Sequence, residues 1–134
     1  MAAKVLDSWA LLAFFKGEPA ATAMEELIHK ASADKVRLLL SVVNWGEVYY
    51  GMWRAGGKDA ADTAAEDLAR LPIELVDVHF HQARQAATYK ATRKMSYADC
   101  FAAALAKETK GAELVTGDSE FEQIEKEIKI SWLK

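Results

Sequence analysis

The sequence contains one cysteine, two prolines and no long uncharged apolar run. A single cysteine, Cys100, cannot form a disulfide within the chain, which favours a reduced, cytoplasmic setting. No segment approaches the roughly 18 uncharged apolar residues that a membrane span needs. The apolar run at the start of the chain ends at Asp7, too early for a signal peptide. We therefore expect a cytoplasmic protein without a membrane span.

Positive charge is also scarce. Lys and Arg together number 17 and Asp and Glu number 20, so the net charge is -3. This balance excludes a generally basic nucleic-acid binder, and an RNA substrate would need local basic patches or bound cations. The 134 residues are 51% hydrophobic, enough for one core. With no linker, repeat or low-complexity tract, we expect one domain over residues 1–134.

Short apolar strands and amphipathic helices alternate along the chain. Strands are expected at residues 3–6, 36–40, 73–78, 112–116 and 128–133, and helices at 8–15, 19–32, 41–55, 59–71, 79–94 and 96–109. A further helix is expected to start after Asp118. The run at 36–40, apolar except for Arg37, is typical of a strand buried on both faces of a parallel sheet. This order predicts an α/β fold with a mostly parallel central sheet and right-handed crossovers.

Four acidic residues fall where such a sheet binds ligands. Asp7 directly follows a strand, Asp118 lies just past another, and Glu47 and Asp99 lie near helix starts. In an open parallel sheet, ligands bind beyond the carboxyl ends of the strands, so we expect these four side chains at one edge. Four like charges there repel one another, or their pKa values rise. Oxygen ligands alone suit Mg²⁺ or Mn²⁺, which can activate water for attack on a phosphodiester.

Each of these acids also has an explanation without any chemistry. The two that follow strands can cap the next helix. The two near helix starts can form capping boxes, Glu47 with Asn44 and Asp99 with Ser96. From the residues alone, both explanations stay open for each acid.

Four segments together resemble the PIN-domain family, and in particular the toxin ribonucleases of VapBC-type toxin–antitoxin pairs. They are Val5-Leu6-Asp7-Ser8 with Ala10-Leu11; Ser41 leading to Glu47-Val48-Tyr49-Tyr50-Gly51; Ser96-Tyr97-Ala98-Asp99 with Ala102-Ala103-Ala104; and Thr116-Gly117-Asp118-Ser119-Glu120-Phe121. Each motif is short, but their order and spacing span the whole chain. The resemblance implies a three-layer α/β/α fold.

The resemblance also implies an activity and partners. It makes Asp7, Glu47, Asp99 and Asp118 the catalytic and metal-binding quartet of an endoribonuclease that depends on Mg²⁺ or Mn²⁺. Family members of this kind act on RNA and often form homodimers. In the toxins, the tail of a cognate antitoxin protein usually occupies the site or its approach.

Three other residues are expected to support the site. By the resemblance, Thr116 matches a small hydroxyl residue, and Glu120 falls where many relatives carry a further acid, at the periphery. Ser8, next to Asp7, can bind a water on the metal or simply cap its helix.

Two further groups have competing explanations. The basic cluster Lys90, Arg93 and Lys94 can contact RNA phosphates or complement the dipole at a helix C-terminus. One helix, at 41–55, is crowded with aromatic residues, for which core or dimer packing is favoured over base stacking. These residues are Trp45, Tyr49, Tyr50 and Trp53.

Two rival functions remain. A response-regulator-like Mg²⁺-binding phosphoacceptor domain also places acids at this edge, but it needs paired acids after the first strand and a Lys after the last. Here Leu6 precedes Asp7 and no Lys closely follows Asp118. A PIN-like domain that binds RNA or protein without cutting should lack members of the quartet, and all four are present. An Asp-x-Asp phosphatase is disfavoured because Trp9 occupies the second acidic position.

Overall fold

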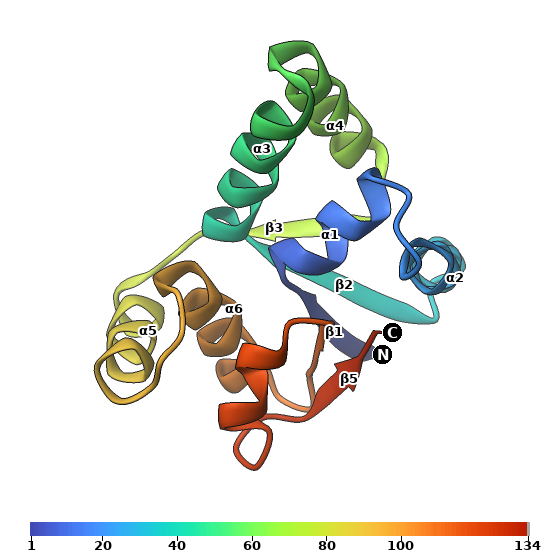
Figure 1. The fold of residues 1–134 in the computed structure, drawn as a ribbon. Helices are drawn as coiled ribbons and strands as arrows, with labels where there is room; N and C mark the ends of the chain where they lie inside the picture. Colours follow the sequence, from blue (N-terminus) through green and yellow to red (C-terminus); the bar gives the residue numbers. More distant parts are fainter. Residues whose placement is uncertain (134) are drawn as a thin grey trace.

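A five-stranded parallel sheet lies at the centre of the structure (Figure 1). In the computed structural model, which describes residues 1–133, the strand order is β3-β2-β1-β4-β5 and every recorded pair is parallel. The strands are β1 (Ala2–Leu6), β2 (Val36–Ser41), β3 (Ile73–Val76), β4 (Glu113–Thr116) and β5 (Ile130–Trp132). The central position of β1 places the residue that follows it, Asp7, at the middle of the carboxyl edge of the sheet.

Helices cover both faces of the sheet and give the expected three layers. They are α1 (Ser8–Phe15), α2 (Ala21–Ser32), α3 (Val42–Gly56), α4 (Lys58–Arg70), α5 (Phe80–Thr92), α6 (Tyr97–Glu108) and the 3₁₀ helix η1 (Ser119–Ile124). One core cluster joins the sheet to α5, α6 and η1, and the other joins it to α1, α2, α3 and α4. Within the described residues, no helix has both the length and the apolarity to cross a bilayer.

The two cores follow from the period-2 alternation of the central strands. Val5 of β1 and Leu39 of β2 belong to the core with α6, whereas Leu6 and Leu40 belong to the core with α1. Because both faces are covered, β1, β2 and β4 are apolar and buried on both faces near their carboxyl ends, whereas the charged Lys4, Arg37 and Glu113 lie towards their other ends. The prediction of an α/β sandwich is therefore confirmed.

The clearest difference from the expected elements is the segment after Asp118, which forms a short 3₁₀ helix, η1. Before it, Gly117 lies against the indole of Trp9. A Cβ at Gly117 would lie 2.2 Å from Cη2 of Trp9, so only glycine fits here. This close contact between α1 and the loop after β4 holds Asp118 beside the start of α1.

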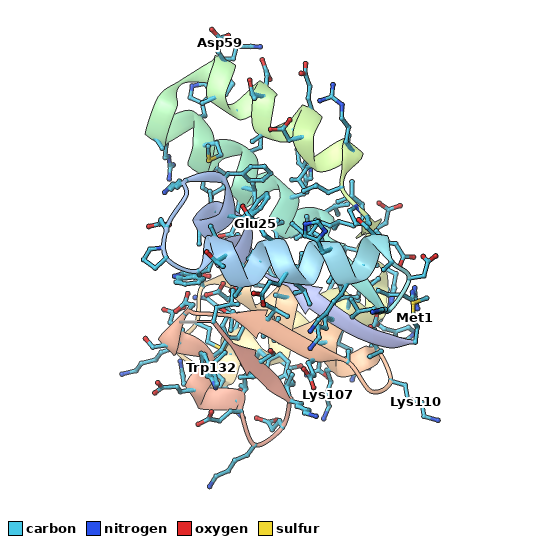
Figure 2. The ribbon with its side chains drawn as sticks, turned by 90° about the vertical axis from the view of Figure 1, so that its right-hand side faces the viewer. Met1, Glu25, Asp59, Lys107, Lys110 and Trp132 are labelled. Carbon is cyan, nitrogen blue, oxygen red and sulfur yellow. The ribbon has the colours of Figure 1, made fainter. Side chains whose placement is uncertain are left out.

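The α3–α4 hairpin projects away from the sheet. Figure 2 shows Asp59, near the start of α4, at the far tip of this hairpin. Helix α3 begins directly after β2, at the carboxyl edge of the sheet. Its first turns therefore lie near Asp7, and its later turns extend away from the edge.

Candidate metal centre

Asp7 is fully buried, and both of its carboxylate oxygens accept hydrogen bonds. Oδ1 accepts from the backbone N of Ala10 at 2.9 Å, as expected for the N-cap of α1, and Oδ2 accepts from the Thr116 hydroxyl. Burial raises the pKa of Asp7 to about 7, and the charges of Asp118 and Glu47 act in the same direction, while the two hydrogen bonds oppose it. The two hydrogen bonds therefore fix the orientation of the carboxylate, while burial and the neighbouring acids disfavour its charge.

The Thr116 hydroxyl connects the loops that follow β1 and β4. It donates to Asp7 and accepts from the backbone N of Asp118 at 3.0 Å. In turn, Oδ1 of Asp118 accepts from the backbone N of Glu120 at 2.9 Å and caps η1. Since β1 and β4 are adjacent strands, this chain of bonds sets the relative position of the two aspartates.

Glu47 enters the site from the second turn of α3 and is held by three donors. The Ser8 hydroxyl at 2.7 Å and Nδ2 of Asn44 at 3.1 Å donate to Oε1, and the Tyr50 hydroxyl donates to Oε2 at 3.4 Å. Nδ2 of Asn44 also donates to the carbonyl of Ala98 at 3.1 Å, which ties α3 to α6. Because Nδ2 of Asn44 faces two acceptors, the orientation of the Asn44 amide is defined.

The two expected capping boxes do not form. Ser41 caps α3 by accepting from the backbone N of Val43 at 3.2 Å, and Asn44 bonds the carboxylate of Glu47 instead of capping the helix. At α6, the Ser96 hydroxyl accepts from the backbone N of Asp99, but the backbone N of Ser96 donates to Glu120 at 3.4 Å. The carboxylates of Glu47 and Asp99 are thus available to the site, because other groups complete the helix ends.

The densest part of the cluster is formed by Asp99, Asp118 and Glu120. One oxygen of each lies within 4.8 Å of the others. The pKa of Asp99 rises to about 8, first because the side chain is buried, then through a hydrogen bond with Glu120 and the charges of Asp118, Asp7 and Glu47. Glu120, expected as a supporting residue, lies in this cluster.

A divalent cation fits this arrangement. Seven ion pairs are formed by the described residues, and none includes an acid of this cluster. The cluster therefore holds converging oxygen ligands without an ion-pair partner among the described residues, and burial together with their mutual repulsion raises the pKa values of Asp7 and Asp99. Hard cations such as Mg²⁺ or Mn²⁺ prefer this donor set.

The basic cluster before α6 makes contacts within the chain. Nζ of Lys90 donates to the carbonyl of Met95 at 2.9 Å, and the Arg93 guanidinium pairs with Glu127 at 2.5 Å. The backbone N of Lys94 donates to Gln123. These contacts favour a structural role for Lys90 and Arg93, and RNA binding by the cluster stays a prediction.

The fold and site together define an α/β domain with an acidic centre at the carboxyl edge of a parallel sheet. Residues 4–127 match the family model of the PIN domain. The chain therefore belongs to the PIN domain family, which confirms the resemblance drawn from the four sequence segments.

Three solved structures illustrate the similarity. VapBC2 from Rickettsia felis, bound to a DNA fragment from its promoter, is 17% identical, with a TM-score of 0.72 over 98% of this chain and 99% of that chain. VapBC from Salmonella typhimurium, bound to DNA, is 21% identical, with a TM-score of 0.72 over 98% of both chains. VapC20 from Mycobacterium tuberculosis, a toxin that cleaves the sarcin-ricin loop, is 20% identical, with a TM-score of 0.72 over 90% and 93%.

At these identities the likeness shows the fold alone. No curated protein gives a significant match to the chain.

Proposed function

We propose that this protein is an endoribonuclease that depends on Mg²⁺ or Mn²⁺ and is the toxin of a VapBC-type pair. The observation that carries the proposal is the convergence of Asp7, Glu47, Asp99 and Asp118, which come from four separate segments of a PIN domain. Without a cation, this cluster costs folding energy through desolvation and repulsion. A metal ion that serves catalysis explains why it is present.

Each side chain has a definite part in this proposal. Asp99 and Asp118 would hold the ion, with Glu120 beside them at the mouth of the site. Glu47 is positioned by Ser8 and Asn44. A bound divalent ion would activate water and neutralise charge on the phosphate during hydrolysis.

Asp7 is the most deeply buried member of the quartet. Its two oxygens are fixed by Ala10 and by the hydroxyl of Thr116, so its carboxylate does not need to reorganise when charge develops nearby. Thr116 acts through Asp7 and Asp118 as a positioning residue.

The partners are part of the same proposal. The solved structures similar in fold include toxin–antitoxin complexes, and this supports a cognate antitoxin for this chain. We further propose a cytoplasmic homodimer, as the resemblance to this family implies. Light scattering at high protein concentration tests the dimer, and a clean monomer would contradict it.

RNA cleavage by the purified protein tests the activity. Varied RNAs are incubated with Mg²⁺ or Mn²⁺, with EDTA as the metal-free control. Asp99→Asn should reduce cleavage by at least about 100-fold, because it removes one ligand charge. The matched control is Asp62→Asn, an exposed acid of α4 paired with Lys58, which should cleave like the wild type.

Equal cleavage in EDTA, or full activity of Asp99→Asn, would contradict the proposal. A contaminating nuclease is excluded if the activity loss follows the variant through identical purification.

A further inference from the structure

Three of the four aromatic residues of α3 pack together. Trp45 stacks on Tyr49 with ring centroids 5.4 Å apart, and Tyr49 meets Trp53 edge-on at 6.0 Å. The Tyr49 hydroxyl donates to Asp62 of α4 at 2.6 Å, so these three aromatic residues lie on the side of α3 that faces α4. Tyr50 has no part in these stacks and requires a separate explanation.

Tyr50 lies on the side of α3 that borders the metal centre. Glu47, Tyr50 and Arg54 are spaced i, i+3 and i+7, so they form one stripe along the helix. The Tyr50 hydroxyl donates to Glu47, and the guanidinium carbon of Arg54 lies 4.8 Å from the centre of the Tyr50 ring. Tyr50 is nevertheless 47% exposed. The partly exposed Tyr50 ring therefore carries the Arg54 guanidinium, and its hydroxyl is hydrogen-bonded to a carboxylate of the site.

The positive charge of Arg54, beside Tyr50, suits the binding of RNA near the acidic site. An RNA that approaches a protein with a net charge of -3 and an acidic site needs a cation near the reacting phosphate. Lys90 and Arg93 are engaged elsewhere, whereas Arg54 forms no ion pair with any described residue. A guanidinium can bind a phosphate through two parallel hydrogen bonds and can also stack on a flat ring.

We propose that Tyr50, with Arg54 on its ring, forms a platform on which one unpaired base of single-stranded RNA stacks beside the metal centre, while Arg54 contacts an adjacent phosphate. The RNA substrate in this inference rests on the proposed function. Bases in a duplex are already stacked and cannot reach such a ring, whereas unpaired bases can be splayed onto aromatic side chains. The platform therefore selects single-stranded segments and loops.

RNA binding by variants that cannot cleave tests the platform. Every protein carries Asp99→Asn, and fluorescence anisotropy measures binding of a fluorescein-labelled, unstructured RNA of twelve nucleotides and of a blunt duplex of the same length. Tyr50→Ala should weaken binding of the single strand by about 5- to 150-fold, the range that base stacking gives. Tyr50→Phe keeps the ring and should bind within about twofold of the parent.

Trp53→Ala is the matched control. Trp53 is on the same helix and 45% exposed, but it packs on Tyr49 instead of bordering Glu47. It should leave RNA binding unchanged, and none of these variants should alter binding of the duplex. In the parent, an abasic site at one nucleotide should weaken binding, and in Tyr50→Ala the same abasic site should add nothing, because the two changes remove one contact.

The inference is overturned if the parent fails to bind the single strand, if Tyr50→Ala binds it like the parent, or if Tyr50→Phe is as weak as Tyr50→Ala. Circular dichroism of each variant shows whether it is folded, and Tyr50→Leu, which keeps an apolar side chain without a ring, replaces Tyr50→Ala if that variant is not. With Asp99 restored, Tyr50→Ala should raise KM well above that of Tyr50→Phe, because both variants lose the hydroxyl that donates to Glu47 and only Tyr50→Ala also loses the ring. Single-strand binding that depends on the ring, without any cleavage by the wild type, would contradict the nuclease and still support the platform.

Discussion

Replacing Asp99 with Asn should stabilise the metal-free protein at pH 8 while weakening its metal binding. In the folded protein the pKa of Asp99 is about 8, compared with an ordinary value of 3.8. The folded state therefore retains a proton between about pH 4 and pH 8 that the unfolded state has released. Asparagine has nearly the same shape and no charge, so it avoids the cost of ionising this side chain.

The size of the effect follows from the shift. A difference of about four pKa units corresponds to about 5–6 kcal/mol if one group carries it alone. Asp99 is hydrogen-bonded to Glu120, which is half-buried, and solvent at that side screens part of the repulsion. We expect about 1–3 kcal/mol of added stability for Asp99→Asn at pH 8 without metal.

The same shift fixes the sign of the pH dependence. A carboxyl group whose pKa is raised by folding favours the folded state most below its unfolded pKa, and this contribution is lost as pH rises to the folded pKa. Asp7, with a pKa of about 7, acts in the same direction. In EDTA, the contribution of these two groups to the free energy of unfolding should thus fall between pH 4 and pH 8.

Urea unfolding in EDTA at pH 5.5, 7 and 8.5 measures this effect. The matched control is Asp62→Asn. Hydrogen bonds from Lys58 and Tyr49 lower the pKa of Asp62, so its contribution to stability should depend on pH with the opposite sign. The stability difference between Asp99→Asn and the wild type should grow with pH, whereas Asp62→Asn should gain nothing. The reasoning is refuted if Asp99→Asn is less stable than the wild type at pH 8.5 in EDTA and the difference does not change with pH.

Two further predictions concern the loop after β4. Thr116→Val removes the hydroxyl between Asp7 and Asp118. Calorimetry should show Mn²⁺ binding weakened about 10- to 100-fold, the usual cost of losing a group that orients a metal ligand. An affinity for Mn²⁺ equal to that of the wild type would argue against this role. Gly117→Ala places a Cβ that overlaps the Trp9 ring. This overlap should lower the free energy of unfolding by about 1–3 kcal/mol or more. An unchanged urea midpoint would show that the ring moves aside at no cost.

The quartet was predictable because its members are defined by sequence position relative to strands and helix starts. Asp7 directly follows an apolar strand, and the strands of a parallel sheet end at one edge. Its position at that edge can therefore be predicted from the sequence without knowledge of tertiary contacts. Asp118 follows β4 by the same logic. Glu47 and Asp99 were placed near helix starts by the same reading of the sequence, and the resemblance to PIN domains added their expected role as ligands of the metal.

The positions of Glu120 and Asn44 depended on contacts that the sequence does not display. Glu120 enters the cluster because Asp118 turns the chain into a 3₁₀ helix, where a regular helix was expected. A helix cap was one of the two explanations left open for Asn44 with Glu47, but Ser41 caps the helix and leaves the amide to bond Glu47 and Ala98. Local capping patterns could not decide between these explanations, because several nearby polar residues satisfy them equally well.

Tyr50 shows a signal that the sequence did contain. It was grouped with the other aromatic residues of α3, for which packing was favoured. Its spacing of three from Glu47 and four from Arg54 places it on the stripe that faces the acids. Helical spacing relative to a candidate ligand thus separates this tyrosine from Trp45 and Tyr49.

Anomalous X-ray diffraction from crystals soaked in Mn²⁺ tests the central claim most directly. The account predicts a manganese peak coordinated by Asp99 and Asp118 and close to Asp7 and Glu47, and its absence from crystals of Asp99→Asn. Crystals without a peak at this site at saturating Mn²⁺, or with peaks only elsewhere on the surface, would contradict the metal centre and the nuclease that depends on it.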